Sequence, residues 1–220
     1  MCGRFSLTAT PEQITEAFQL ERLPNYETSY NIPPGQKILA VVRLDDGRHK
    51  AVNLFWGLIP PWAKDPIIGH RLINARAETV AEKPSFRTAF QRKRCLIPAN
   101  GFYEWAKTDQ GKQAHHIHRI DDGLFAFAGL WEHWEKDAET LYSCSIITTA
   151  ANALIQPIHE RMPVIIGSQH YDDWLDKQQP QDRLQALLAN DAYQKMAVTT
   201  VTDWVNNPVH DDKRCIAAVS

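Results

Sequence analysis

The chain has 220 residues, of which 44% are hydrophobic and 23% are charged, and its formal net charge is −2. This length and composition suit one large or two small globular domains, and no apolar run is long enough to span a bilayer. The slightly negative net charge excludes a protein whose whole surface is basic, as in many nucleic-acid-binding proteins. Any nucleic-acid site must therefore be a local basic groove.

The first half of the chain predicts one helix followed by strands. Thr10, Pro11 and Gln13 occupy the positions of an N-cap, a first-turn proline and a capping-box partner, so a helix is expected to run from here to about residue 20. An irregular, proline-rich stretch follows. Strands are expected at 37–44 and 49–57 with a hairpin turn at 45–47, then a long loop to residue 72, a helix at 84–92, and a strand at 94–105 that turns at Gly101.

The second half predicts mainly strands with short helices between them. The expected strands are 113–119, 124–131, 141–149, 162–166 and 195–201, and the expected helices are 150–158, 168–175 (capped by Ser168) and 181–189. There is no regular β-α-β alternation, repeat or composition break. We therefore expect a single domain, residues 1–220, of the α+β class, built on antiparallel β-sheets in a barrel-like arrangement with short peripheral helices.

The four cysteines are far apart and include no C-x-x-C pair; they are Cys2, Cys95, Cys144 and Cys215. This spacing argues against a zinc ribbon or a disulfide framework and is typical of a reducing cytosol. The N-terminal segment also lacks the basic, apolar and small-residue parts of a signal peptide. These features predict a cytoplasmic protein with no membrane association.

Cys2 has the most distinctive chemistry in the chain. Aminopeptidases remove an initiator Met before a small residue, and removal would leave Cys2 with an α-amine (reference pKa ~7.7–8.0) next to a thiol (~8.5). Such an aminothiol can form a Schiff base with an aldehyde, and the thiol can then close a thiazolidine ring. The alternative interpretation is a frayed terminus without a function.

Three polar segments could supply groups to a site. Asn74, Arg76 and Glu78 would share one side of an extended segment, although Asn74 could also be a turn or cap residue. Glu104 lies among aromatic and apolar neighbours that would raise its carboxyl pKa, or it could form a buried ion pair with Arg94 or Arg76.

His159 follows the predicted helix 150–158, where it could take part in catalysis or simply compensate the helix dipole. His115, His116 and His118 invite a metal interpretation, but no carboxylate motif or Cys pair accompanies them, so a solvated strand and no metal are expected. Serine-hydrolase and nucleotide-binding motifs are absent from the sequence.

Taken together, six segments resemble one family. They are Cys2-Gly3-Arg4-Phe5, Tyr30-Asn31-Ile32-Pro33-Pro34, Trp56-Gly57-Leu58-x-Pro60-x-Trp62, Asn74-Ala75-Arg76-x-Glu78, the stretch from Cys95 to Trp105, and His159-x-Arg161-Met162-Pro163. In this order, from residue 2 to about residue 165, they resemble the SRAP (SOS response-associated peptidase) family. The loop between Trp62 and Asn74 is longer than the family pattern.

The resemblance implies a sensor of abasic sites in single-stranded DNA. It implies a covalent thiazolidine cross-link through Cys2 after loss of Met1, which shields the lesion in the DNA damage response, together with autopeptidase and abasic-site lyase activity. Glu104 would be the general acid/base, His159 would assist ring opening and reversal, and Asn74 would hold the sugar and the Cys2 backbone.

The same resemblance implies how DNA is held. Arg4, Arg76 and Arg161 would grip phosphates, and Thr148 would make a further backbone contact. Asn31, Pro34 and Trp62 would form the rim where bases stack. It implies a monomer without a cofactor, cytoplasmic and associated with the nucleoid when bound to DNA.

Two alternatives stay open from the residues alone. In an N-terminal-nucleophile cysteine amidohydrolase, Cys2 would attack an amide and its own amine would be the base, which makes Glu104 and His159 unnecessary. In a non-enzymatic single-stranded DNA-binding module, the arginines and Trp62 would matter and Cys2 would not.

Overall fold

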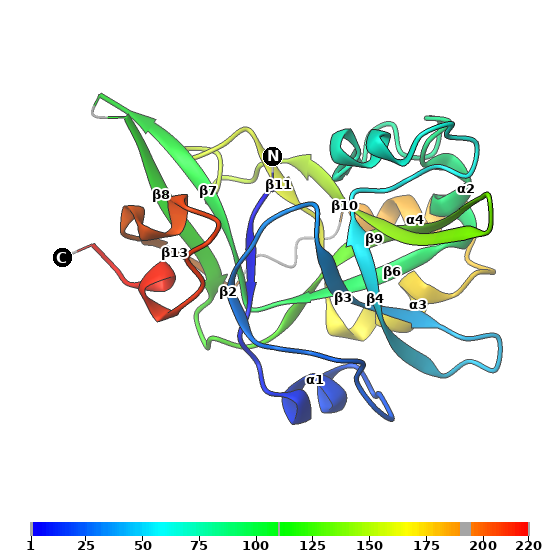
Figure 1. Cartoon of the computed structure of the whole chain (residues 1–220). Helices are drawn as coiled ribbons and strands as arrows, with labels where there is room; N and C mark the ends of the chain where they lie inside the picture. The colour runs from blue at the N-terminus through cyan, green and yellow to red at the C-terminus, as the bar shows by residue number, and fades with distance from the viewer. Residues whose placement is uncertain (1, 110, 190–194, 220) are drawn as a thin grey trace.

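The computed structural model describes residues 2–109, 111–189 and 195–219 of the chain. Five strands pair in a closed ring and form a barrel, seen at the right of Figure 1. In ring order they are β10 (Glu139–Ala150), β4 (His49–Trp56), β3 (Lys37–Arg43), β6 (Arg94–Ala99) and β9 (Phe125–Lys136), which pairs with β10 again. Every pairing in this ring is antiparallel except that of β4 with β10, which is parallel.

Three short strands extend the barrel at one end. β5 (Asn74–Arg76) pairs in parallel with β10, β11 (Arg161–Pro163) pairs antiparallel with the end of β10, and β12 (Ile165–Ile166) pairs with β9. Thr148 in β10 is opposite Arg76 on one side and Pro163 on the other. The end of β10 therefore brings together segments that are far apart in the sequence.

A second sheet, at the left of Figure 1, leads the N-terminal segment to the barrel. Its strand order is β13 (Met196–Thr200), β8 (Gly111–Arg119), β7 (Gly101–Thr108), β1 (Phe5–Leu7) and β2 (Ser29–Ile32). β6 continues into β7 through Asn100, so one nearly continuous extended segment serves both sheets. The N–H of Tyr103 donates to the carbonyl of Arg4 at 2.9 Å, which places Glu104 beside Gly3.

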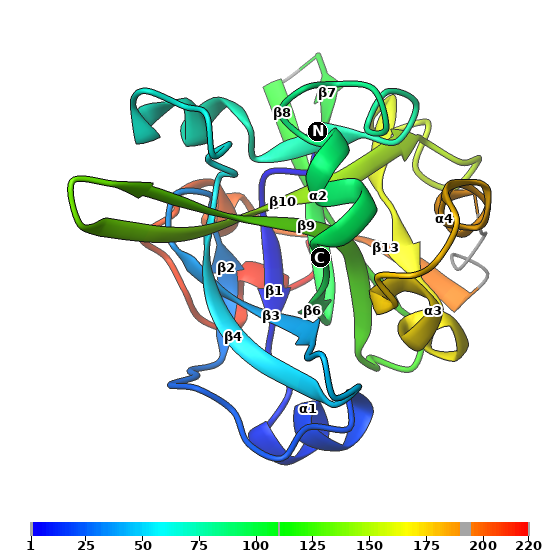
Figure 2. The same cartoon turned by 90° about the vertical axis from the view of Figure 1, so that its right-hand side faces the viewer.

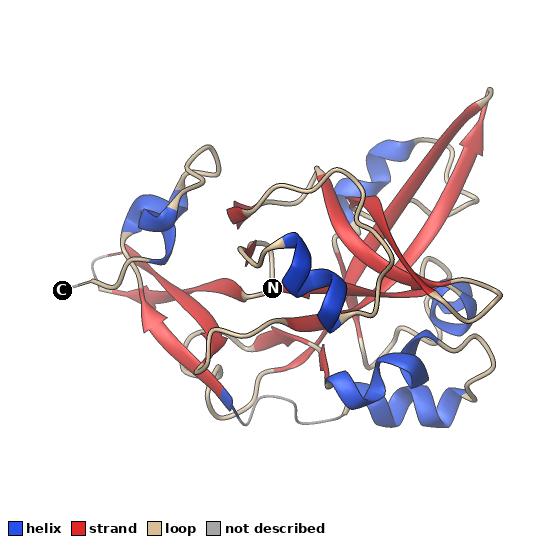
Figure 3. Cartoon of the chain, turned by 90° about the horizontal axis from the view of Figure 1, so that it is seen from below, coloured by secondary structure: helices blue, strands red, loops and turns tan. Residues whose placement is uncertain are grey.

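Short helices lie outside the strands, as Figures 2 and 3 show. They are α1 (Pro11–Ala17), α2 (Arg87–Arg92), α3 (Tyr171–Leu175) and α4 (Gln181–Leu188), with 3-10 turns at Pro66–Arg71, Ser168–His170, Asp203–Asn206 and Lys213–Ile216. The capping box of α1 is confirmed: Thr10 and Gln13 exchange side-chain hydrogen bonds with each other's backbone N–H groups. The helix ends at Ala17, and Gln19 has a φ of 53°, a left-handed conformation that stops it three residues before the predicted end.

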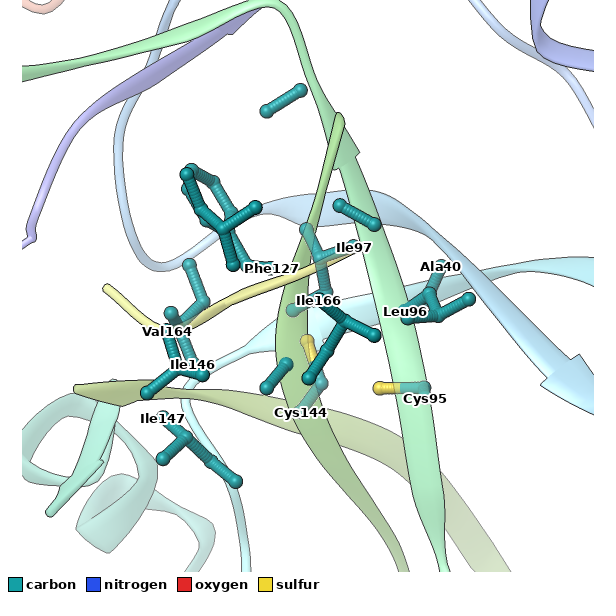
Figure 4. Close-up of a cluster of buried hydrophobic side chains, with 14 of the residues drawn as sticks. Ala40, Cys95, Leu96, Ile97, Phe127, Cys144, Ile146, Ile147, Val164 and Ile166 are labelled. Carbon is teal, nitrogen blue, oxygen red and sulfur yellow. The ribbon is translucent and has the colours of Figure 1, made fainter. Parts of the chain in front are cut away.

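Apolar side chains fill the barrel. Figure 4 shows Cys95, Leu96 and Ile97 of β6 with Phe127 of β9 and Cys144 of β10 in this core. Burial raises the pKa of the Cys95 and Cys144 thiols, so neither is a reactive thiolate at neutral pH. Buried free cysteines of this kind act as small apolar side chains.

The expected α+β class with mainly antiparallel, barrel-like sheets is confirmed, and two local predictions are wrong. Among the described strands, β4 and β5 run parallel to β10 and the other pairings are antiparallel. No helix forms at 150–158: the side chain of Asn152 accepts from the N–H groups of Leu154 and Ile155 and makes a turn instead. Ser168 starts a 3-10 turn that leads into α3 without a side-chain cap.

Candidate active site

Cys2 lies just before β1 and is fully buried. The side-chain Nδ2 of Asn74 donates to the Cys2 carbonyl at 2.9 Å, so β5 fixes the backbone at this residue. The other amide atom, Oδ1 of Asn74, is buried and has no hydrogen-bond partner among the described residues. A buried acceptor without a partner is costly, so Oδ1 is suited to a donor that arrives with a ligand.

Glu104 belongs to β7, where Tyr103 and Trp105 precede and follow it in the sequence, and it is only 3% exposed. Burial raises the pKa of Glu104 to about 7, so its protonated and ionised forms are both populated near neutral pH. A carboxyl group in this state can donate and accept protons. Of the predicted ion pairs, the one with Arg94 is wrong, because all three nitrogens of that guanidinium donate to the backbone carbonyls of Phe90, Trp174 and Asp176. The pair with Arg76 stays a prediction.

The Cys2 thiol and the Glu104 carboxylate lie within electrostatic range of each other. Burial raises the pKa of the Cys2 thiol far above its ordinary value, and the negative charge of Glu104 raises it further. The thiol is therefore protonated at neutral pH. Because only a thiolate is a strong sulfur nucleophile, the arrangement does not favour a first attack by sulfur.

His159 is half-buried and precedes β11 by two residues. His159 Nδ1 lies 2.9 Å from the backbone N of Arg161 and 3.2 Å from the Arg161 carbonyl oxygen. Because the backbone N–H can only donate, we assign Nδ1 as its acceptor and place the proton of the neutral ring on Nε2. Burial lowers the pKa of His159, which keeps the ring neutral at pH 7. The helix-dipole alternative is wrong, because a turn and not a helix precedes this residue.

Arg4 is held within the protein by the C-terminal part of the chain. Its Nη1 donates to Asn31 Oδ1 at 2.7 Å and to the Val205 carbonyl at 3.0 Å, and its guanidinium lies 5.8 Å from the centre of the Trp105 ring. Asn31 is itself buried and donates to the carbonyls of Val205, Asn207 and His210. The predicted phosphate contact of Arg4 and the rim role of Asn31 stay predictions.

Arg161 is the centre of a second network. It forms a two-pronged ion pair with Glu78, and its Nη2 also donates to the Thr148 carbonyl at 2.7 Å. Thr148 is fully buried, with its hydroxyl 3.5 Å from the Ala75 carbonyl, so its contact with DNA stays a prediction that would act through Arg161. Arg76, in β5, is exposed beside this network.

The remaining predicted residues are at the surface. Trp62 is 57% exposed, the most open tryptophan among the large apolar side chains of the described chain. Pro34 is half-buried in the loop between β2 and β3. Both positions are accessible, and their stacking roles stay predictions.

The structure brings together three predicted residues directly, Cys2, Asn74 and Glu104, and places His159 at the same end of β10 through β11. Two features of the site lie outside the sequence predictions. Glu78 has no predicted role, although the pattern Asn74-x-Arg76-x-Glu78 contains it. The segment around Val205 is not predicted either, because its contact with Arg4 spans 201 residues and leaves no local sequence signal.

Other expectations concern metals and membranes. Within residues 2–109, 111–189 and 195–219, no group of three or more His, Cys, Asp or Glu side chains could hold a metal ion. His116 and His118 share a strand face as expected, but His116 is buried against Ser6, so a fully solvated strand is wrong. No helix in the described part of the chain has the length and apolar character needed to cross a membrane.

Comparison with known proteins finds relatives along nearly the whole chain. The family model described as SOS response associated peptidase (SRAP) matches residues 1–208. Abasic site processing protein YoqW of Bacillus subtilis is 44% identical over 222 residues, covering 98% of this chain and 99% of that protein. Abasic site processing protein YedK of Escherichia coli is 31% identical over 181 residues, covering 80% and 79%. A crystal structure of a protein from Bacteroides thetaiotaomicron matches with a TM-score of 0.88 and 26% identity, over 100% of both chains.

Proposed function

The chain belongs to the SRAP family, and on that premise we propose that it processes abasic sites in single-stranded DNA by cross-linking to them through Cys2. Relatives named abasic site processing proteins, YoqW and YedK among them, support the substrate. The observation that carries the proposal is the bond between Asn74 Nδ2 and the Cys2 carbonyl, with Glu104 in range of the same thiol. These contacts fix the residue that becomes N-terminal once Met1 is removed.

The α-amine of Cys2 is the first nucleophile in this proposal. The sugar of an abasic site opens from a hemiacetal to an aldehyde when its ring oxygen gains a proton and its C1′ hydroxyl loses one. Glu104 is suited to both transfers because burial sets its pKa to about 7, and His159 offers its Nε2 proton. The orphaned Oδ1 of Asn74 can accept a hydrogen bond from a sugar hydroxyl.

The thiol acts second. The amine adds to the C1′ aldehyde and water leaves, which gives an imine. The protonated thiol of Cys2 then adds across the C=N bond, so that sulfur bonds to C1′ and its proton ends on nitrogen. The raised pKa of this thiol is consistent with the amine acting first, because a protonated thiol is a weak initial nucleophile. In the second step Glu104 can take the proton from sulfur as it attacks C1′ and pass it to nitrogen.

Two further activities belong to the proposal. While Met1 is present the Cys2 nitrogen is an amide and cannot form an imine, so hydrolysis of the Met1–Cys2 bond by the protein itself would create the active form. If ring closure is slow, loss of a C2′ proton from the imine expels the 3′ phosphate, which is a lyase reaction. The cross-link would shield the lesion in the cytoplasm, at the nucleoid, during the DNA damage response.

The test is to mix the protein with a single-stranded oligonucleotide that contains one abasic site and to run the mixture on a denaturing gel. We expect a slow-migrating adduct that needs Cys2 and does not form with the intact oligonucleotide. Binding without an adduct would indicate a DNA-binding module. An adduct that persists in Cys2→Ala would contradict the assignment of the nucleophile.

A further inference from the structure

Glu78 occupies the accessible end of the Arg161 guanidinium. Its Oε1 accepts from Nη1 at 2.6 Å and its Oε2 from Nη2 at 2.9 Å, which is a parallel two-pronged ion pair. The Arg161 side chain is 13% exposed and the Glu78 side chain 48% exposed. The pair therefore lies at the surface, with the carboxylate on its solvent side.

A carboxylate and a phosphate present the same pair of acceptor oxygens to a guanidinium. We propose that Glu78 is an internal competitor for the DNA phosphate at Arg161, and that it weakens the hold of the protein on intact single-stranded DNA. This inference rests on the proposed function, which gives Arg161 to a phosphate. It assigns a specificity role to a residue that neither the chemistry at Cys2 nor the stacking rim requires.

Apart from the Nη1–Nη2 edge that Glu78 occupies, the Arg161 guanidinium has no second edge that could make a two-pronged contact with a DNA phosphate. Nη2 has a second bond, to the Thr148 carbonyl at 2.7 Å, which holds the side chain in place. The Nε atom is buried and has no hydrogen-bond partner within the described part of the chain, so it faces the protein and not the solvent. A phosphate that seeks a two-pronged contact must therefore displace the Glu78 carboxylate from Nη1 and Nη2.

Glu78 is placed so that it can leave. It lies in the turn after β5, and Arg76 two residues earlier is exposed. Arg161 and, to a smaller extent, Arg76 lower the pKa of Glu78, which keeps the carboxylate ionised and in range of both cations. A displaced Glu78 can turn toward solvent or Arg76 without burying an unpaired charge.

The consequence is discrimination between intact and damaged DNA. Intact single strands must replace the Glu78 pair with a phosphate pair and gain little from the exchange. An abasic strand pays the same cost, but the covalent bond at Cys2 then holds it. Glu78 would therefore shorten the time spent on undamaged DNA without slowing the chemical step.

The experiment measures fluorescence anisotropy of a labelled intact oligonucleotide over a range of salt concentrations. Glu78→Gln should bind about fivefold tighter than the wild type, the upper end of the effect of an exposed ion pair. Its log–log salt slope should be steeper by up to about 0.7, because the fraction of wild-type complexes that keep the Glu78 pair lacks the phosphate contact at Arg161. Glu82→Gln is the matched control: it removes the same charge four residues away, from an exposed side chain with no ion pair within the described residues.

A double-mutant cycle shows whether Glu78 acts through Arg161. In the Arg161→Gln background, Glu78→Gln should leave the affinity unchanged. Glu78→Asp keeps the charge, but its shorter side chain reaches Nη1 and Nη2 of Arg161 less well. Its affinity for DNA should therefore lie between those of the wild type and Glu78→Gln. Thermal unfolding of each variant verifies that it is folded, and Glu78→Asp remains as a test if Glu78→Gln does not fold.

Weaker binding by Glu78→Gln would overturn the proposal, because it would mean that Glu78 orients Arg161 for DNA. An equal gain in Glu82→Gln, or a gain that persists without Arg161, would reduce the effect to general charge and also overturn it. The proposal would also be overturned if intact DNA bound neither the wild type nor Glu78→Gln. Failure of the proposed function is seen separately, as the absence of a Cys2-dependent adduct with abasic DNA.

Discussion

The side-chain amide of Asn74 donates a hydrogen bond of 2.9 Å to the carbonyl of Cys2, 72 residues earlier in the chain. β5 carries Asn74 and is fixed in turn by its parallel pairing with β10, where Asn74 lies opposite Ile146. The position of Cys2, the proposed nucleophile, is thus set by the barrel and not by the N-terminal segment alone.

Asn74→Ala should therefore slow cross-linking by about tenfold to a hundredfold, because the Cys2 backbone and the sugar lose a common anchor. The affinity for intact single-stranded DNA should stay unchanged, since no phosphate contact is removed. Adduct rate and equilibrium binding are measured side by side. Asn53→Ala is the control, because that exposed amide bonds only to the Asn25 carbonyl among the described residues. An equal loss of binding and rate would make Asn74 a DNA-positioning residue.

Much of the fold follows from local patterns in the sequence. The capping box of Thr10 and Gln13 predicts the start of α1, and β3 and β4 lie within a residue of their expected bounds. The parallel pairing of β4 with β10 could not be predicted, because it depends on closing a ring of strands far apart in sequence. The helix expected at 150–158 fails at Asn152, whose side chain competes for the backbone N–H groups that a helix would use.

In the candidate site, too, some residues could be predicted from the sequence and others could not. Cys2 and Glu104 could be singled out by their own chemistry, the first as an aminothiol and the second as a carboxyl group in an apolar run. The partners of the arginines could not be predicted from the sequence, because Arg161 contacts Glu78 across 83 residues and Arg4 contacts Val205 across 201. Such contacts arise from the sheet order, which no short sequence pattern contains.

Glu104→Gln should slow cross-linking by roughly a hundredfold or more while DNA affinity is retained, because a neutral amide cannot exchange the proton. The wild-type rate should change with pH near the Glu104 pKa of about 7, a change that the variant lacks. The cross-linking reactions of both proteins are stopped at set times over a series of pH values, and the adduct is quantified on denaturing gels to give the two pH–rate profiles. A rate that falls in proportion to binding would contradict a role in proton transfer.

The same carboxyl group predicts a stability change. Its folded pKa of about 7 lies above the unfolded value of ~4.3, so the folded state holds a proton that the unfolded state has lost between these pH values. This contribution to stability is fully present below pH ~4.3 and is lost as the pH rises toward 7. Glu104→Gln should remove that decline and unfold at a higher temperature than the wild type at pH 8. Parallel pH dependence of thermal unfolding in both proteins would contradict the raised pKa.

His159→Gln should slow both formation and reversal of the cross-link by roughly a hundredfold. Glutamine keeps a hydrogen-bond donor but cannot shuttle a proton, so the loss reports on proton transfer. Formation is followed with abasic DNA, and reversal by transfer of the adduct to excess unlabelled abasic DNA. His170→Gln is the control. His170 lies on the 3-10 turn before α3, and its ring contacts Asp173 in that helix. Loss of formation with normal reversal would contradict a role in both directions.

The central claim is a thiazolidine between Cys2 and the abasic sugar. It is tested most directly by the intact mass of the purified adduct and by mapping the modified peptide. We expect the mass of the protein without Met1 plus the oligonucleotide minus one water, with the modification on Cys2. Cys2→Ser should give little stable product and Cys2→Ala none. Cys215→Ala should behave as the wild type. A heat-stable adduct of full strength in Cys2→Ser, or a modification mapped to another residue, would contradict the account.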